Sequence, residues 1–166
     1  MKYSTLVTLA VAPLAVATVA QGSIVTIRDI AIDGLQPVDP TFSTGTGNAT
    51  VVINTDTRFV EISGTFEGLT STVIGAHLHG PADFGEFSPR VILPLEFVGD
   101  TSGSFSAART VSPTNLGYIL DSLSYINIHT NNHPSGEIRG QVVVPSPGSA
   151  GLLLLLPAFA TRRSRR

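Results

Sequence analysis

Cysteine is absent from the 166-residue chain, and only 13% of the residues are charged, whereas 42% are hydrophobic. Without cysteine, the chain cannot form a disulfide scaffold, a thiolate zinc site or a cysteine nucleophile. The low charge and the high apolar content exclude a long intrinsically disordered protein. Any metal or catalytic chemistry must therefore use histidine, carboxylate or hydroxyl groups, and the length predicts one compact domain.

The N-terminal end has the order of a secretory signal peptide. Lys2 precedes an uncharged apolar run at residues 6–20, which gives way to polar Gln21. This order of a basic region, an apolar region and small residues predicts residues 1–20 as a signal peptide, cut after Ala20. The run is short for a membrane span, and Pro13 would kink it. A buried helix of the domain is the alternative.

The C-terminal end combines a proline hinge, an apolar segment and a cluster of arginines. The predicted tail, residues 145–166, contains a run of leucines, and its hinge and basic end consist of Val144, Pro145, Pro147, Arg162, Arg163, Arg165 and Arg166. It resembles the PEP-CTERM sorting signal of exported prokaryotic proteins, which an exosortase cuts, although Ser146 stands where that family has glutamate. The apolar segment is shorter than the roughly 20 residues of a stable span, which predicts transient membrane insertion with the arginines in the cytoplasm. A tail anchor that stays uncut is the alternative.

Between these two ends, the predicted domain at residues 21–144 is acidic. Its basic residues are five arginines, whereas it contains all twelve aspartates and glutamates of the chain. Because phosphate neutralisation needs a basic face, nucleic acid is not an expected partner.

Short alternating segments separated by turn residues predict an all-β domain. In residues 59–66, Val60 and Ile62 alternate with Glu61 and Ser63, which is the period of a half-buried strand. Further strands are predicted at residues 24–32, 49–53, 73–79, 91–97, 103–111, 125–130 and 137–144. Many short strands with turns between them favour an antiparallel, Greek-key-like β-sandwich or barrel.

One short helix is predicted after Ser112. Ser112 would be its N-cap and Pro113 its first residue, and an apolar stripe would follow from Leu116, Ile119, Leu120 and Leu123. We expect this helix to cover one open edge or end of the sandwich.

The histidines lie in two of the predicted strands or next to them. Residues two apart on a strand share a face, so His77 and His79 point together, and Asn127 and His129 point together. The same alternation places alternate residues of the last strand on its outer side. If the three strands are neighbours, these side chains form a polar cluster on the outer wall of the sandwich. The cluster would consist of His77, His79, His129, Glu137 and Arg139, and Asn127 would lie on the same face.

Two interpretations of these residues remain open. Three neutral imidazoles can bind zinc or copper, although no fourth ligand is evident and Arg139 would repel a cation. Alternatively, the histidines are an ordinary hydrogen-bonded pair, and Arg139 pairs with Glu137 or donates to backbone carbonyls. His133 falls in a turn, where we expect it to be solvated.

Several segments resemble the CHRD domain, a family common in prokaryotic exported proteins. The resemblance is carried in order by Gly34-Leu35, residues 59–69, residues 76–80 (AHLHG), residues 125–130 (YINIHT) and residues 134–141 (PSGEIRGQ). It implies an extracellular β-sandwich module without an established catalytic activity.

A fainter similarity connects the chain with copper/zinc superoxide dismutase. It rests on residues 66–69 (FEGL), the histidine pair that follows and the later Ile-His strand. That family holds copper on the outside of a Greek-key barrel, which implies His77, His79 and His129 as ligands here. No histidine for a zinc site occurs between Gly80 and Tyr125, and the disulfide cysteines are missing. The similarity therefore predicts shared architecture and not dismutase activity.

Taken together, the sequence predicts an exported protein of the cell envelope or extracellular matrix with a binding or structural role, and it disfavours an enzyme. The expected partners are the export machinery and an exosortase-like protease, with an envelope polysaccharide or protein as ligand. The alternative function is a mononuclear copper or zinc metalloprotein.

Overall fold

The computed structural model describes residues 23–145. They form the strands β1 (Ile24–Asp33), β2 (Thr46–Asn54), β3 (Phe59–Glu67), β4 (Val73–His79), β5 (Val91–Pro94), β6 (Glu96–Gly99), β7 (Gly103–Thr110), β8 (Ser124–Thr130) and β9 (Ile138–Val142), and the helix α1 (Pro113–Leu120). The predicted signal cleavage at Ala20 and most of the predicted tail, including Pro147, Arg162, Arg163, Arg165 and Arg166, lie outside the described residues. Within residues 23–145, no helix has the length and apolar character needed to cross a membrane.

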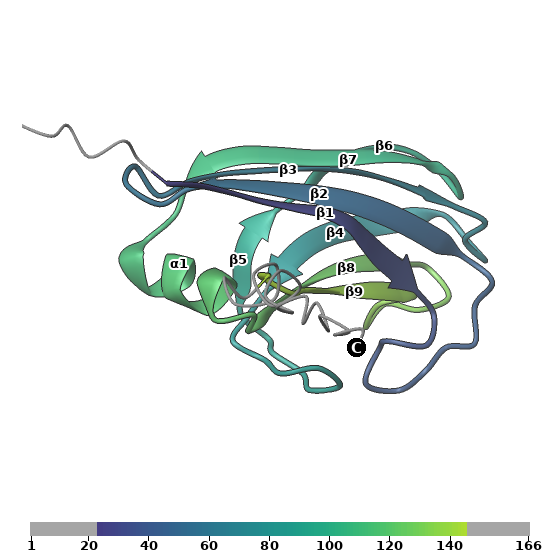
Figure 1. Ribbon diagram of the computed structural model, residues 1–166. Coiled ribbons are helices and arrows are strands. Elements are labelled where there is room, and N and C mark those ends of the chain that lie inside the picture. Colours follow the sequence, from purple (N-terminus) through teal and green to yellow (C-terminus); the bar gives the residue numbers. More distant parts are fainter. Residues whose placement is uncertain (1–22, 146–166) are drawn as a thin grey trace, which may run out of the picture.

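Antiparallel hydrogen bonding joins the strands into one sheet in the order β5-β4-β8-β9-β1-β2-β3-β7-β6. This sheet folds into two layers: β1, β2, β3, β7 and β6 form one, and β5, β4, β8 and β9 form the other (Figure 1). The pair Asp33 and Arg139 joins β1 to β9 at one side. At the other side, the Leu95 N–H donates to the Ala76 carbonyl at 2.9 Å. The sheet is therefore nearly closed, and the predicted all-β sandwich or barrel with one short helix is confirmed.

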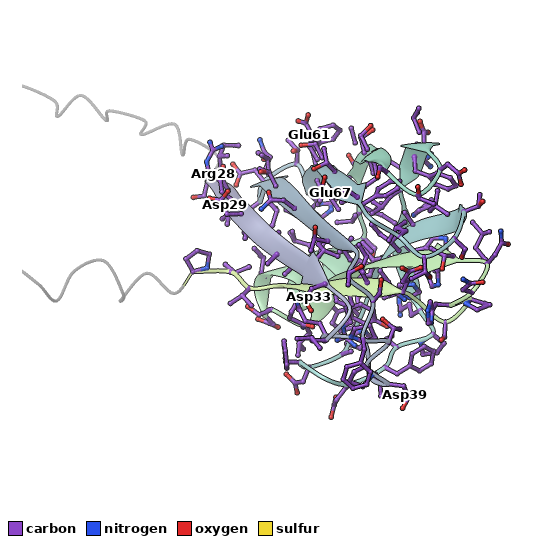
Figure 2. The ribbon with its side chains drawn as sticks, turned by 90° about the vertical axis from the view of Figure 1, so that its right-hand side faces the viewer. Arg28, Asp29, Asp33, Asp39, Glu61 and Glu67 are labelled. Carbon is purple, nitrogen blue, oxygen red and sulfur yellow. The ribbon has the colours of Figure 1, made fainter. Side chains whose placement is uncertain are left out.

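The core lies between the two layers and follows the alternation of the strands. Val60, Ile62 and Phe66 of β3 are buried, as predicted. Glu61 and Glu67 project from the outer side of the same strand (Figure 2). Burial of one face by isoleucine, valine and phenylalanine supplies the main stabilising contribution to such a fold.

Helix α1 lies at one end of the sandwich (Figure 1). Its first turn is capped because the Asn115 N–H donates to the Ser112 hydroxyl at 3.2 Å. Leu116 and Ile119 face the core. The predicted cap, first residue and the part of the apolar stripe up to Leu120 are confirmed, whereas Leu123 lies beyond the end of the helix.

Residues 91–97 form two strands and not one, which corrects the sequence expectation. β5 pairs with β4, whereas β6 pairs with β7 in the other layer. The chain crosses between the layers at Leu95, which follows Pro94 and is buried. Because proline has no N–H to donate, Pro94 is suited to the end of a strand.

Two loops cover the outer face of β8 and β9. Gln36, in the loop that follows β1, accepts a hydrogen bond from the Gln141 N–H at 3.1 Å. Gln141 donates in turn to the Ala82 carbonyl, in the loop that follows β4, at 3.0 Å. Every residue of β9 is consequently buried. The expectation of an open outer wall is therefore wrong at β9. The alternation of a strand predicts on which face a side chain lies, but it does not predict whether a loop covers that face.

The phase of β9 can be tested with two neighbouring valines. Val142 is fully buried, whereas Val143 is 58% exposed. We expect Val142→Asp to prevent folding, because a buried unpaired charge costs several kcal/mol of a total of about 5–15 kcal/mol. Val143→Asp should change the unfolding free energy by less than about 0.5 kcal/mol. Equal urea-unfolding midpoints for the two variants would show that the strand phase is wrong.

Candidate functional site

Pairing between β4 and β8 brings three imidazoles together. His77 lies opposite Asn127, and Gly75 lies opposite His129, so His77 and His129 are diagonal neighbours on one face. The ring centroids of His77 and His129 are 5.0 Å apart. The ring centroid of His79 lies 5.5 Å from that of His77 and 5.8 Å from that of His129. One nitrogen from each ring can be chosen so that all three lie within 4.8 Å of one another.

Because Gly75 has no side chain, the rings of His77 and His129 can lie close to its backbone. A Cβ atom at this position would lie 3.2 Å from Cε1 of His77. Such a contact is too close unless the imidazole shifts. A side chain at Gly75 would therefore disturb the arrangement of the three rings.

The hydrogen bonds of His129 fix its proton. Nδ1 lies 2.9 Å from the Pro134 carbonyl, which can only accept, so Nδ1 carries the hydrogen. Nε2 then keeps a lone pair, and it lies 3.5 Å from Nδ2 of Asn127. A second group that orients a histidine in this way is typical of metal ligands.

The other two histidines present buried nitrogens without partners. Within the part of the chain that the structure describes, Nδ1 of His77 and both ring nitrogens of His79 are buried and make no hydrogen bond. His79 is only 6% exposed. An unpaired polar group costs about 1–3 kcal/mol when it is buried. A donor or a cation bound at the lone pair of the His79 ring would remove part of this cost.

Burial keeps the three imidazoles neutral. It lowers the pKa of His77 and of His129 below the ordinary histidine value. For His79, burial together with the neighbouring rings of His129 and His77 lowers the pKa to about 4, although backbone groups of Arg90 and Ser88 near its ring act in the opposite direction. At neutral pH each of the three rings therefore has one unprotonated nitrogen, whose lone pair can bind a metal ion.

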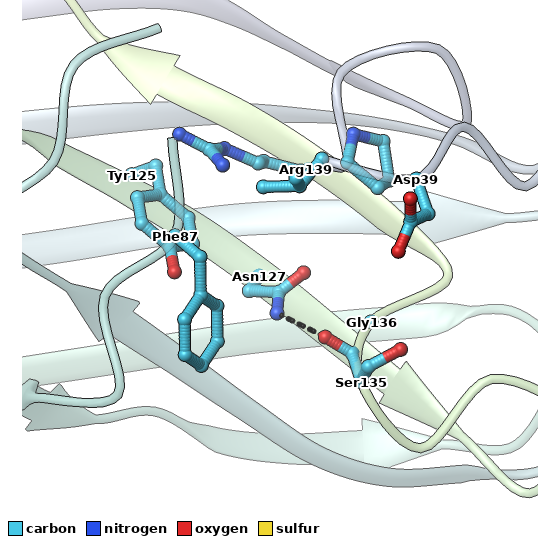
Figure 3. A pocket seen from close by; sticks show the side chains of 9 residues that line it. Asp39, Phe87, Tyr125, Asn127, Ser135, Gly136 and Arg139 are labelled. Atoms are coloured by element: carbon cyan, nitrogen blue, oxygen red, sulfur yellow. Dashed lines mark hydrogen bonds between the residues drawn. The ribbon is translucent and has the colours of Figure 1, made fainter. Parts of the chain in front are cut away.

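Tyr125 and Arg139 form a stack behind His79. The rings of Tyr125 and His79 are nearly parallel, with centroids 5.3 Å apart. The guanidinium carbon of Arg139 lies 3.6 Å from the centroid of Tyr125 (Figure 3). The Tyr125 hydroxyl donates to the Ser88 carbonyl at 3.1 Å and accepts from the Ser88 N–H at 3.2 Å. The loop after β4 is thus anchored to the polar face.

Arg139 donates to backbone carbonyls, as one of the two sequence interpretations has it. Its acceptors are the carbonyls of Glu86 at 2.6 Å and Asp83 at 3.2 Å, and the amide oxygen of Gln141 at 2.9 Å. None of these is a carboxylate. The guanidinium therefore remains a net positive charge near the histidines.

Glu137 lies apart from the histidines and corrects the expectation of one polar cluster. Its buried carboxylate accepts hydrogen bonds from the hydroxyls of Ser43 at 2.6 Å, Thr130 at 2.6 Å and Thr70 at 2.9 Å, and from the Thr70 N–H at 2.7 Å. Burial by itself would raise the pKa of Glu137, but these hydrogen bonds outweigh it and hold the pKa below the usual value. Glu137 thus joins two loops and β8 and does not belong to the candidate site.

A cavity of about 170 Å³ adjoins the site (Figure 3). Tyr125, Asn127 and Arg139 line its base, and Val38 and Phe87 belong to the loops beside it. Asn127 donates to the Ser135 carbonyl at 3.0 Å. Gly136 has a φ of +125°, and a Cβ at this position would collide with the Asn127 side chain. The Ser-Gly turn therefore holds the amide in place.

Three of these residues were not predicted as part of a site. Tyr125 shares its face with Asn127 and His129, so the two-residue period of β8 could have indicated it. Gly75 and Pro134 carry no such signal, because their roles depend on close approaches between segments. His133, which we expected in a turn, does not belong to the group of three imidazoles.

The fold and the site together define a small all-β module with one histidine cluster on its polar face. The CHRD domain family matches residues 29–142, more than half of the chain, and the chain therefore belongs to this family. Chordin of Xenopus laevis is 32% identical over 89 residues, which are 51% of this chain and 9% of chordin. The chain thus spans a small part of that relative. No solved structure matches the chain.

The role of Glu137 in stability can be tested by Glu137→Gln. The amide nitrogen replaces an oxygen that accepts hydrogen bonds, so we expect a loss of about 2–4 kcal/mol in unfolding free energy. Glu61→Gln on the exposed side of β3 is the matched control and should change stability by less than about 0.5 kcal/mol. Urea denaturation measures both, and an equally small loss for the two variants would contradict the role given to Glu137.

Proposed function

We propose that this protein is an exported module of the cell envelope or extracellular matrix that binds one transition-metal ion through His77, His79 and His129. Membership of the CHRD family supports an extracellular binding or structural module. The family does not say what the module binds. The histidine cluster is the feature of this chain that suggests a ligand.

The observation that carries the metal proposal is that, among the described residues, buried nitrogens of His77 and His79 make no hydrogen bond, and Nε2 of His129 has only a long contact of 3.5 Å with Nδ2 of Asn127. The competing interpretation was a hydrogen-bonded histidine pair, but no hydrogen bond among the described residues joins two of these imidazoles. A bound ion would take up one lone pair from each ring. Zinc and copper are the metals that favour imidazole nitrogen.

The export proposal rests on the two ends of the sequence. A signal peptide cut after Ala20 would direct the chain out of the cell. A tail with the order proline, apolar segment and arginines would hold it transiently in the membrane until an exosortase-like protease cuts. The partners proposed for this route are the export machinery and that protease. An envelope polysaccharide or protein remains the proposed structural ligand.

Metal binding can be tested with histidine variants. Chelator-treated protein should bind one zinc or copper ion per chain, measured by calorimetry and by elemental analysis after dialysis. We expect His77→Ala and His79→Ala to lose this stoichiometric binding, because three ligands become two. His133→Ala removes a histidine outside the cluster and should bind as the wild type does. Absence of stoichiometric metal in the wild type would refute this function.

Processing of the tail can be tested by mass spectrometry of the protein recovered from outside its native host cell. We expect a chain that begins at Gln21 and has lost Arg162, Arg163, Arg165 and Arg166. A recovered chain that still ends at Arg166 would reject the sorting signal and leave an uncut anchor.

A further inference from the structure

The charge around the three imidazoles suggests which ion they hold. The cluster consists of His77, His79 and His129, and within residues 23–145 no carboxylate joins it. All three ligands are neutral. The positive charge of a bound ion would therefore not be compensated by its ligands.

The Arg139 guanidinium, which stacks on Tyr125, carries a positive charge, as a bound metal ion would. Tyr125 of β8 lies between β4, which carries His79, and β9, which carries Arg139, and it contacts both side chains. One aromatic ring thus separates the guanidinium from the imidazole. Because Coulomb repulsion scales with the product of the charges, Arg139 disfavours a doubly charged ion about twice as strongly as a singly charged one.

The residues beside the cluster supply no fourth protein ligand. Gly75 has no side chain, and Asn127 turns its amide nitrogen toward His129 while that nitrogen donates to the Ser135 carbonyl. Zinc held by three histidines needs a water as its fourth ligand, and divalent copper prefers a tetragonal set that would need further ligands as well. Monovalent copper is satisfied by three nitrogens. Coordination number and charge therefore favour the same ion.

We infer that the site binds copper as Cu⁺ in preference to Cu²⁺ and Zn²⁺. This inference rests on the proposed metal-binding function and specifies its ion and oxidation state. Three neutral imidazoles hold the ion, and the Arg139–Tyr125 stack disfavours the second positive charge.

Competition titrations measure the preference directly. Cu⁺ is added without oxygen in competition with bicinchoninate, and Cu²⁺ and Zn²⁺ are added in competition with nitrilotriacetate. We expect Cu⁺ to bind at least about tenfold more tightly than either divalent ion. For the one-electron copper couple, each tenfold preference raises the reduction potential by about 59 mV relative to the unbound ion.

The variant Asn127→Asp tests the electrostatic cause, because it replaces the amide beside His129 with a negatively charged carboxylate of the same size, although it also removes the hydrogen bond to the Ser135 carbonyl. We expect it to shift the ratio of Cu⁺ to Cu²⁺ affinity toward Cu²⁺ by about tenfold or more. Asn48→Asp adds the same charge at an exposed position of β2 and should leave the ratio unchanged. Melting curves of both variants establish that they are folded.

The outcomes separate this inference from the function on which it rests. If none of the three ions binds stoichiometrically, the metal-binding function itself fails. If the histidines bind Cu²⁺ or Zn²⁺ as tightly as Cu⁺, the function stands and the preference for Cu⁺ is overturned. A Cu⁺ preference that folded Asn127→Asp leaves unchanged would overturn the electrostatic cause. A preference that this substitution reduces supports the inference.

Discussion

The rest of this structure depends on the pairing of polar groups on a buried face of β8 and β9. Two loops cover this face, so its polar side chains lose water and need partners from the protein. Glu137 obtains them from three hydroxyls and an N–H group, and Arg139 from two backbone carbonyls and Gln141. These hydrogen bonds also attach the loops to the sheet. Loop conformation and strand packing are therefore parts of one arrangement.

The histidine cluster differs from these side chains, because it includes buried polar atoms that have no hydrogen-bond partner among the described residues. Close to groups whose hydrogen bonds are satisfied, His79 is nearly fully buried, and neither of its ring nitrogens makes a hydrogen bond within residues 23–145. Natural proteins leave few buried polar groups unpaired, and a functional role or a bound ion is among the explanations for those that remain. The polar face thus contains both the hydrogen bonds by which Arg139 attaches the loop after β4 and the residues for which we propose a ligand.

The strands and the grouping of the histidines follow from local patterns in the sequence. A period of two placed Val60 and Ile62 inside, aligned His77 with His79 and turned His129 outward, because alternation is a property of each strand by itself; that His129 joins the pair depends on the pairing of β4 with β8, which was a condition of the prediction. What the sequence did not reveal depends on distant segments. Ser43 reaches Glu137 and Gln36 reaches Gln141 only after the chain has folded back on itself. No local period records such contacts, so the burial of β9 and the separate place of Glu137 could not be predicted.

The pairing of β4 with β8 also bears on when a triad of imidazoles first exists. His77 and His79 are close in any extended chain, but His129 joins them only after β5, β6, β7 and α1 have been synthesised and β8 has docked. A chain that crosses a membrane unfolded would carry only the pair. The full triad then arises where folding is completed. The metal content of that compartment, and not that of the cytoplasm, would determine which ions the triad meets.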